Sequence, residues 1–495
     1  MNEQRGGGGD LLLGKVPACG YDPATRFLSI CEKAEMVEPY LRLFKLHGQS
    51  CLAWLNKSYQ QRAPKEFPRK EWSPVEKAFL GRLAHEQDHH FRHHYSTFGL
   101  LSYWTQALRA RAFLRVVEEG CPEDSMARWK REWKCIDRQW NGVLHGGGNA
   151  RRRFGKKGGA FAVPDGLNLG LDPGCRMELP VTGDYVLGAT ALFEALALSR
   201  EITLVRISYG RNEQWIGQLD SSMPLMEGYN RARIVWDSML SESLVPFSDS
   251  HPVWMHVSPQ RVQPMEFYLA ADLALWVPFF PDVDGNSRSD YATGWQDIHP
   301  GWRFLRIVDF FRSSGKQWAP PDSYPGVFSE QHVQIQNEIC ERFNWPTPMD
   351  LASAWLLFLR KTLDSGEVVG SFPERFDRNR CIASCELLAT HLRSPADVCY
   401  GILAPENRGR HWFSGVECDD GYLFYDEMNG SKMPHPFATE KIIGQVAADF
   451  PAAALSKEMH ELFVSNAAAH LSRIAANGRV ASDEWEVLLG KALGI

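Results

Sequence analysis

The stretch His85-Glu86-Gln87-Asp88-His89-His90-Phe91-Arg92-His93-His94 contains five histidines in ten residues. Its first five residues form the pattern H-E-x-x-H, with His85 and His89 four residues apart. An α-helix turns once in about 3.6 residues, so these two side chains would lie one above the other on one helix face. Two imidazoles in that position can bind one tetrahedral metal ion, and the carboxylate of Glu86 can reach a water molecule on that ion. The stretch therefore predicts a zinc site on a helix, with Glu86 as general base.

The residues before this stretch favour a helix. Ser73 can cap the helix N-terminus, Pro74 suits the first helical position, and Glu76 completes a capping box. Gly81 is the one helix breaker between Pro74 and Tyr95. The sequence therefore predicts a helix from Pro74 to about Tyr95 that holds the H-E-x-x-H motif in its later turns.

The motif resembles that of the zincin metallopeptidases, over a small part of the 495 residues. The resemblance implies that His85 and His89 bind Zn²⁺, that Glu86 activates water, and that a third ligand comes from further along the chain. It also implies a peptide or protein substrate. The longer metzincin pattern is absent, because Arg92 and Tyr95 stand where that pattern has a glycine and a third histidine.

The segment Thr182–Glu201 supplies two candidates for the third ligand. We predict it as a helix, in which Glu194 shares a face with apolar residues such as Leu187 and Leu198. A buried carboxylate is costly unless it is paired, protonated or bound to a metal. Glu194 therefore resembles the downstream glutamate ligand of the gluzincins, with Glu201 as a partner for one of the histidines. The alternative is that Glu194 pairs with an arginine in the core.

The rival ligand is Asp184. The pattern Thr182-x-Asp184-x-x-Leu187-Gly188 partly resembles the aspzincin motif G-T-x-D-x-x-Y-G. Asp184 also stands where it could cap the predicted helix, which is a common use of aspartate. The sequence ranks Glu194 before Asp184 and leaves both open. Tyr185 and His145 are candidates to stabilise an oxyanion, without support from their spacing.

Residues 145–159 contain three consecutive glycines and five basic residues, which predicts a mobile loop. The spacing G-x-x-x-x-G-K-[S/T] of a phosphate-binding loop is not met, so a connector is favoured over a phosphate site. Cys381 and Cys385 lie on a predicted apolar helix face, which favours buried thiols over a second zinc site.

The whole chain is predicted to be mainly α, with a multi-helix zincin-like core and a few short strands. We expect an N-terminal helical segment (1–72), a metal-binding catalytic core (73–318) and a mostly helical C-terminal region (319–495), divided by the proline-rich stretch 319–326. Strands are expected at Ile202–Ser208 and near Tyr422–Tyr425. Further helices are expected at 223–244, 264–277, 302–311, 349–363 and 379–392.

Composition excludes several other classes of protein. The net charge of −6 argues against a general nucleic-acid binder. No stretch approaches the roughly 20 apolar residues of a membrane span. The N-terminal apolar run is too short for a signal peptide, and eleven scattered cysteines indicate reduced thiols, so we expect a cytoplasmic protein without a membrane partner.

Three functions are compatible with this sequence. The first is a zinc-dependent hydrolase, most simply a metallopeptidase. The second is a helical di-iron carboxylate protein, in which Glu86-x-x-His89 would be one of two Glu-x-x-His motifs; no convincing second motif is found. The third is a non-enzymatic helical interaction protein, in which the histidines form a solvated surface cluster.

Overall fold

The computed structural model describes part of the chain. The described residues are 18–22, 27–31, 74–102, 124–125, 127–129, 131, 142, 144–148, 151–152, 167–168, 178–209, 227–240, 265–281, 294–314, 326–364, 372–399, 423–425 and 437–438.

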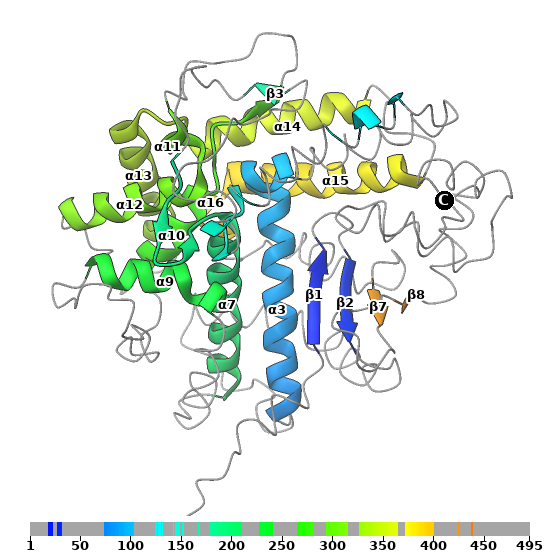
Figure 1. Cartoon of the computed structure of the whole chain (residues 1–495), viewed down its shortest axis with the longest axis horizontal. Coiled ribbons are helices and arrows are strands. Elements are labelled where there is room, and N and C mark those ends of the chain that lie inside the picture. The colour runs from blue at the N-terminus through cyan, green and yellow to red at the C-terminus, as the bar shows by residue number, and fades with distance from the viewer. Residues whose placement is uncertain are drawn as a thin grey trace, which may run out of the picture.

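The described chain is mainly α, as predicted (Figure 1). The helices are α3 (Pro74–Tyr95), α7 (Ala189–Tyr209), α9 (Glu227–Leu240), α10 (Met265–Ala274), α11 (Trp295–Ile298), α12 (Pro300–Ser314), α13 (Gly326–Phe343), α14 (Pro348–Asp364), α15 (Phe372–Arg393) and α16 (Pro395–Cys399). The strands are β1 (Ala18–Asp22), β2 (Phe27–Cys31), β3 (Leu167–Asn168), β4 (Val181–Thr182), β5 (Tyr185–Val186), β6 (Phe280–Pro281), β7 (Leu423–Tyr425) and β8 (Phe437–Ala438).

The largest sheet joins segments from both ends of the chain, in the order β1-β2-β7-β8. β1 and β2 are antiparallel and pair Ala18 with Cys31, whereas β2 and β7 are parallel and pair Ser29 with Phe424. β7 confirms the strand expected near Tyr425. Two small antiparallel pairs, β3 with β6 and β4 with β5, lie outside this sheet.

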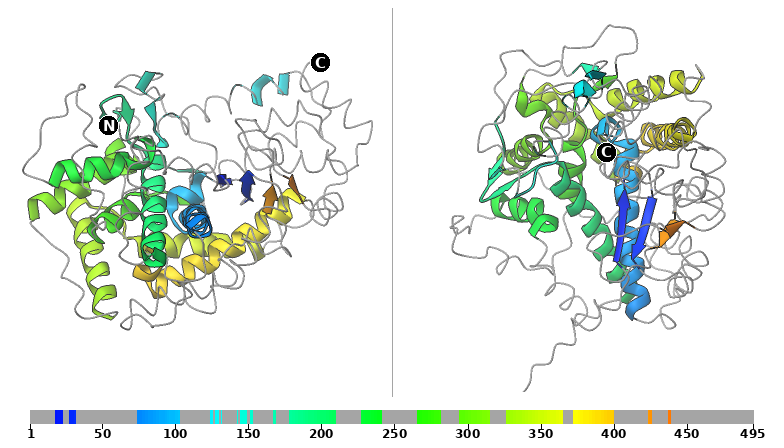
Figure 2. Two further views of the ribbon diagram at one scale, coloured as in Figure 1. Left: turned by 90° about the horizontal axis from the view of Figure 1, so that it is seen from below. Right: turned by 45° about the vertical axis from the view of Figure 1, so that its right-hand side comes forward.

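Helices α3 and α7 lie side by side at the centre of the molecule (Figures 1 and 2). They run in opposite directions, because His85 lies near Glu201 whereas His93, two turns later in α3, stacks on Phe193. The bounds of α3 confirm the helix predicted around the histidine stretch. α7 forms where alanine and leucine are frequent, and these residues favour helix and pack closely.

One continuous core joins the expected catalytic core and the expected C-terminal region. The buried cluster contains residues from both sides of position 319. The Trp355 indole donates a hydrogen bond of 2.8 Å to the carbonyl of Phe279, and the Trp345 indole donates one of 2.7 Å to Asp297 Oδ1. The proline-rich stretch therefore separates helices in the chain without separating two cores.

Two expected elements differ from the structure. The N-terminal segment 1–72 was expected to be helical, yet its described residues are the strands β1 and β2. The short apolar run Phe27-Leu28-Ser29-Ile30-Cys31 forms a strand because pairing with a neighbouring strand satisfies its backbone. Conversely, residues 202–208 were expected to form a strand and instead continue α7 to Tyr209. No breaker interrupts α7, so packing against α3 outweighs the strand preference of its β-branched residues.

The first residues of the glycine- and arginine-rich stretch 145–159 are held in place, in contrast to the mobile loop expected there. Gly147 and Val186 form a β-bridge, and the Thr190 amide donates a hydrogen bond of 3.0 Å to the carbonyl of His145. These contacts fasten residues 145–148 to β5 and to the start of α7. Most of the remaining stretch lies outside the described residues.

No helix in the described part of the chain is long and apolar enough to cross a bilayer. Cys340, Cys381, Cys385 and Cys399 carry no disulfide. Burial raises the pKa of Cys385 to about 11 and that of Cys340 to about 12, so both remain neutral thiols at physiological pH. These values fit the prediction of reduced core cysteines.

Gly301 lets the start of α12 approach the segment between β5 and α7. A Cβ atom at Gly301 would lie 1.9 Å from the carbonyl oxygen of Leu187, which is a backbone atom and cannot rotate away. We predict that Gly301→Ala lowers the free energy of unfolding by about 1–3 kcal/mol or more, measured by denaturant titration. Gly148→Ala is the matched control, because a Cβ there meets nothing within 4 Å. Equal stability of the two variants would contradict this packing.

His391 predicts a pH-dependent stability. Its ring stacks on Trp276 and Tyr95, with centroid distances of 4.5 and 5.9 Å. Burial, together with the nearby His332, lowers the pKa of His391 to about 3. The unfolded chain binds this proton near pH 6.5, so acid favours unfolding between about pH 6.5 and 3, by up to about 1.4 kcal/mol per pH unit.

We therefore predict that His391→Phe, of similar shape, loses less stability than the wild-type chain between pH 7 and 4.5. Free energies of unfolding at the two pH values give the comparison. His332→Phe should behave alike, because burial also lowers the pKa of His332 to about 3. Identical pH slopes in the wild-type chain and both variants would show that these histidines are not neutral in the folded state.

Candidate metal centre

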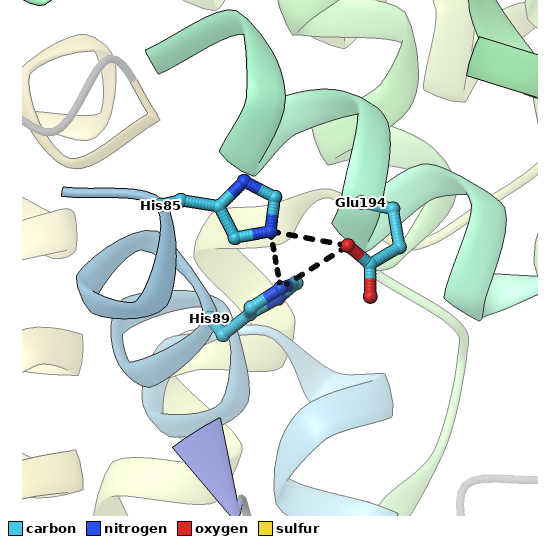
Figure 3. Close-up of side chains that lie close together, drawn as sticks. All are labelled: His85, His89 and Glu194. Atoms are coloured by element: carbon cyan, nitrogen blue, oxygen red, sulfur yellow. Dashed lines mark hydrogen bonds and ion pairs between the residues drawn. The ribbon is translucent and has the colours of Figure 1, made fainter. Parts of the chain in front are cut away.

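Three side chains from α3 and α7 converge between the two helices (Figure 3). His85 and His89 project from α3, and Glu194 approaches from α7, 109 residues further along the chain than His85. His85 Nε2 lies 3.1 Å from Glu194 Oε2 and 3.1 Å from His89 Nε2, and His89 Nε2 lies 3.5 Å from Glu194 Oε2. The structure thus brings together the three residues that the sequence selected as metal ligands.

These separations match the edges of a zinc coordination tetrahedron. Ligand atoms about 2.0–2.1 Å from a tetrahedral zinc ion lie about 3.3 Å from one another. The three measured distances, 3.1, 3.1 and 3.5 Å, lie on either side of this value. Two imidazole nitrogens and one carboxylate oxygen are also ligand types that zinc prefers. The donor set therefore fits zinc in both chemistry and spacing.

The three ligand-type atoms of the triad need a proton or a metal ion among them. Burial disfavours an ionised Glu194, but the charge of His89 and hydrogen bonds from His85 and His89 hold the pKa of Glu194 well below its usual range. Burial likewise lowers the pKa of His85, but hydrogen bonds to Glu194 and Glu201 and the charge of Glu86 raise it well above its usual value. Because each of the three atoms carries a lone pair when it acts as a ligand, either a proton on an imidazole Nε2 or a metal ion must lie among them.

Glu201 contacts the other nitrogen of His85. Its Oε2 lies 3.2 Å from His85 Nδ1, and both side chains are largely buried. A carboxylate at Nδ1 holds the proton on that nitrogen and leaves the lone pair of Nε2 for a metal. This is the supporting role that the sequence suggested for Glu201. Position 201 lies seven residues after Glu194, so both glutamates lie on the same side of α7.

All five histidines of the stretch are buried, with exposed fractions of 0 to 8%. The three histidines outside the triad, His90, His93 and His94, are therefore not on the surface. His93 Nδ1 lies 2.7 Å from the carbonyl oxygen of His89, and His94 Nδ1 lies 2.6 Å from the carbonyl oxygen of His90. His93 also stacks on Phe193 with centroids 4.3 Å apart. The interpretation of the histidines as a solvated surface cluster is therefore wrong.

Asp184 is not among the ligand-type side chains that converge with His85 and His89, and the expectation that it caps the helix is wrong. It follows Gly183, whose φ of +59° forms the tight turn between β4 and β5, and its side chain is fully exposed. It pairs with Arg151 at 2.5 Å. It does not cap α7 either, because that helix begins at Ala189. The expectation of one helix over Thr182–Glu201 failed because this turn and the hairpin β4–β5 precede the helix.

Glu86 is half-buried and lies about 100° around α3 from His85, as adjacent helical residues do. Of the two oxyanion candidates, His145 is hydrogen-bonded to the first turn of α7 through its carbonyl. Its ring contacts Phe98, with 5.1 Å between the centroids. Tyr185 lies in β5 with its ring 5.8 Å from the guanidinium carbon of Arg231. Neither contact involves the triad, so the structure adds no support for their role.

The sequence did not indicate a set of charges beside the triad, of which Asp88, Arg92 and Asp272 are buried and Arg200 is largely buried. Asp88 and Arg92 are four apart on α3, a spacing at which opposite charges pair on a helix. That spacing was the available signal. Their partners on other helices could not be read from it.

Within the described residues, His85, His89 and Glu194 are the one group of three ligand-type side chains close enough to share a metal ion. Cys381 and Cys385 belong to no such group there. The chain matches no known protein-family model, no curated protein and no solved structure. What can be inferred about its chemistry therefore comes from the site itself.

The two candidates for third ligand can be separated by one measurement. We predict that Glu194→Gln reduces zinc binding about a hundredfold or more, because it removes a charged ligand next to both imidazoles. Asp184→Asn should bind zinc like the wild-type chain, since Asp184 is exposed and paired with Arg151. Zinc affinity by chelator competition gives the answer, and a reversed order would assign the site to Asp184.

Proposed function

We propose that this chain is a zinc-dependent hydrolase, most simply a metallopeptidase. The observation that supports it is the convergence of His85, His89 and Glu194 at the edge lengths of a zinc tetrahedron. Three protein ligands and one open position are the composition of a catalytic zinc site, whereas structural zinc sites use four protein ligands. The donor set of two histidines and one glutamate occurs in hydrolytic zinc sites.

Each residue has a defined part in the proposed reaction. His85, His89 and Glu194 would hold the ion, and Glu201 would orient the ring of His85 through Nδ1. Glu86, next to His85 in the chain, would take a proton from the attacking water and pass it to the leaving group. When bound, zinc supplies a Lewis acid that polarises the substrate carbonyl and lowers the pKa of water.

The proposed substrate is a peptide or protein. This assignment follows from the resemblance of H-E-x-x-H to the zincins, in which the same residue types act on a peptide carbonyl. Burial of the histidines favours such chemistry, because electrostatic interactions are stronger where water is excluded.

Metal analysis of the purified, untagged chain tests the first part of the proposal. We predict about one zinc per wild-type chain and a large loss of zinc in His85→Ala, because that variant removes one of three protein ligands. Two irons per chain would instead support a di-iron protein. A wild-type chain without metal after reconstitution would show that a proton on His85, and not an ion, balances Glu194.

Glu86→Gln tests the chemistry separately from metal binding. We predict that this variant keeps its zinc and loses about 10²–10⁴-fold in hydrolysis rate, the usual contribution of a general base. Cleavage of a peptide library by the zinc-loaded protein, followed by mass spectrometry, provides the measurement. Glu266→Gln, which changes another partly buried glutamate on α10, is the control and should stay active. Full activity of Glu86→Gln would exclude this mechanism.

A further inference from the structure

A series of four charged side chains, three of them buried and Arg200 largely buried, runs across the helices that carry the triad. Arg200 of α7 approaches Asp88 of α3, with Nη1 3.5 Å from Oδ1. Arg92, one turn after Asp88, binds it through two nitrogens, Nε to Oδ2 at 3.1 Å and Nη2 to Oδ1 at 3.2 Å. Arg92 also pairs with Asp272 of α10. Two cations and two anions thus alternate through the interior with no net charge.

The Arg92–Asp272 end of this series of charged side chains contacts two further helices, α10 and α16. Arg92 Nη2 donates a hydrogen bond of 2.6 Å to the carbonyl of Cys399 in α16. The Tyr95 hydroxyl donates to Asp272 Oδ1, and the Trp276 indole donates to Asp272 Oδ2 at 3.3 Å. Asp272 is therefore fixed from several directions, and α3 is held against α10 and α16 as well as α7.

The charges stand next to the metal-binding residues on both helices. Asp88 directly precedes His89 on α3, and Arg200 directly precedes Glu201 on α7. Helix geometry places Asp88 about 60° to one side of His85, while Glu86 lies about 100° to the other. The Arg200–Asp88 contact therefore crosses the α3–α7 interface immediately beside the triad, on the side away from the proposed base.

Stability alone does not account for these charges. Buried ion pairs seldom stabilise a fold more than apolar side chains of similar shape, because both charges must lose their hydration. Apolar packing is also non-directional, so alanine- and leucine-rich helices can pack at more than one axial offset. A guanidinium group has a rigid, planar donor geometry, and its pairing with a carboxylate fixes both distance and direction.

We propose that Asp88 and Arg200 are positioning residues that hold α3 and α7 in the one register at which His85, His89 and Glu194 converge. Arg92 and Asp272 carry the same constraint to α10. This inference rests on the proposed metal site. It means that the network of Arg200, Asp88, Arg92 and Asp272 preorganises that site. A shift of α3 by a fraction of a turn would move both histidines relative to Glu194 and spoil the three short distances.

Asp88→Asn and Arg200→Met in the full-length chain test the proposal, with zinc and Co²⁺ as the probes. Both variants keep all three ligands, yet their dissociation constants for zinc should rise about ten- to hundredfold. The visible spectrum of bound Co²⁺ reports coordination geometry, and both variants should lose the strong absorption typical of a four-coordinate site. Arg200→Lys should recover part of the affinity, because it restores the charge opposite Asp88.

A double-mutant cycle shows whether the two residues act together. If Arg200 acts through Asp88, the Asp88→Asn/Arg200→Met chain should lose about as much zinc affinity as either single variant. Arg306→Met is the matched control, because Arg306 pairs with a buried aspartate, Asp297, on helices away from the triad. It should lower thermal stability without changing zinc affinity or the Co²⁺ spectrum.

The outcomes separate this proposal from the proposed function. Unchanged zinc affinity and Co²⁺ spectrum in Asp88→Asn and Arg200→Met, with only a loss of thermal stability like that of Arg306→Met, would overturn the positioning role and leave the metal site intact. Failure of both variants to fold would assign the network to stability and overturn the proposal as well. A wild-type chain that binds neither zinc nor Co²⁺ would refute the proposed function first, and the positioning role with it.

Discussion

The contact between α3 and α7 is the interaction on which the site depends. Neither helix alone has a complete ligand set, since α3 supplies two imidazoles and α7 supplies the carboxylate. The apolar surface of α7 draws the helices together by removing alanine and leucine side chains from water. Hydrophobic packing brings these two helices together, and the charged groups between them determine how they face each other.

The same interface combines groups with opposing demands. The interface carries three acidic side chains, those of Glu194, Glu201 and Asp88. They are paired with Arg200, Arg92 and the imidazoles. Isolated buried charges would be too costly, so the acids and bases occur in matched sets along the interface. One set consists of Glu194, Glu201 and the imidazoles. The other, Asp88 with Arg200 and Arg92, lies beside the triad. The α3–α7 interface thus carries a line of polar and charged groups next to the apolar core cluster.

Local sequence was sufficient to predict α3 and the convergence of His85, His89 and Glu194. The absence of strong breakers and the H-E-x-x-H spacing predicted the helix and the direction of its histidines, and helical periodicity selected Glu194. Local sequence was insufficient where contacts with distant parts of the chain decide the secondary structure. Phe27–Cys31 becomes a strand because its partners include β7, nearly 400 residues away, and residues 202–208 are helical as the end of α7, a helix that packs against α3. Asp184 was predicted to cap a helix because one aspartate cannot distinguish a hairpin turn from a helix start.

The separation of 109 positions between His85 and Glu194 in the sequence has a consequence for folding. In the unfolded chain these side chains are far apart on average, and bringing them together costs loop-closure entropy that a preformed α3–α7 pair has already overcome. A metal ion bound by all three residues would therefore bind the folded chain much more tightly than the unfolded chain. Metal supply in the cell would then act on the amount of folded protein as well as on its chemistry, because binding to one state shifts the folding equilibrium toward it.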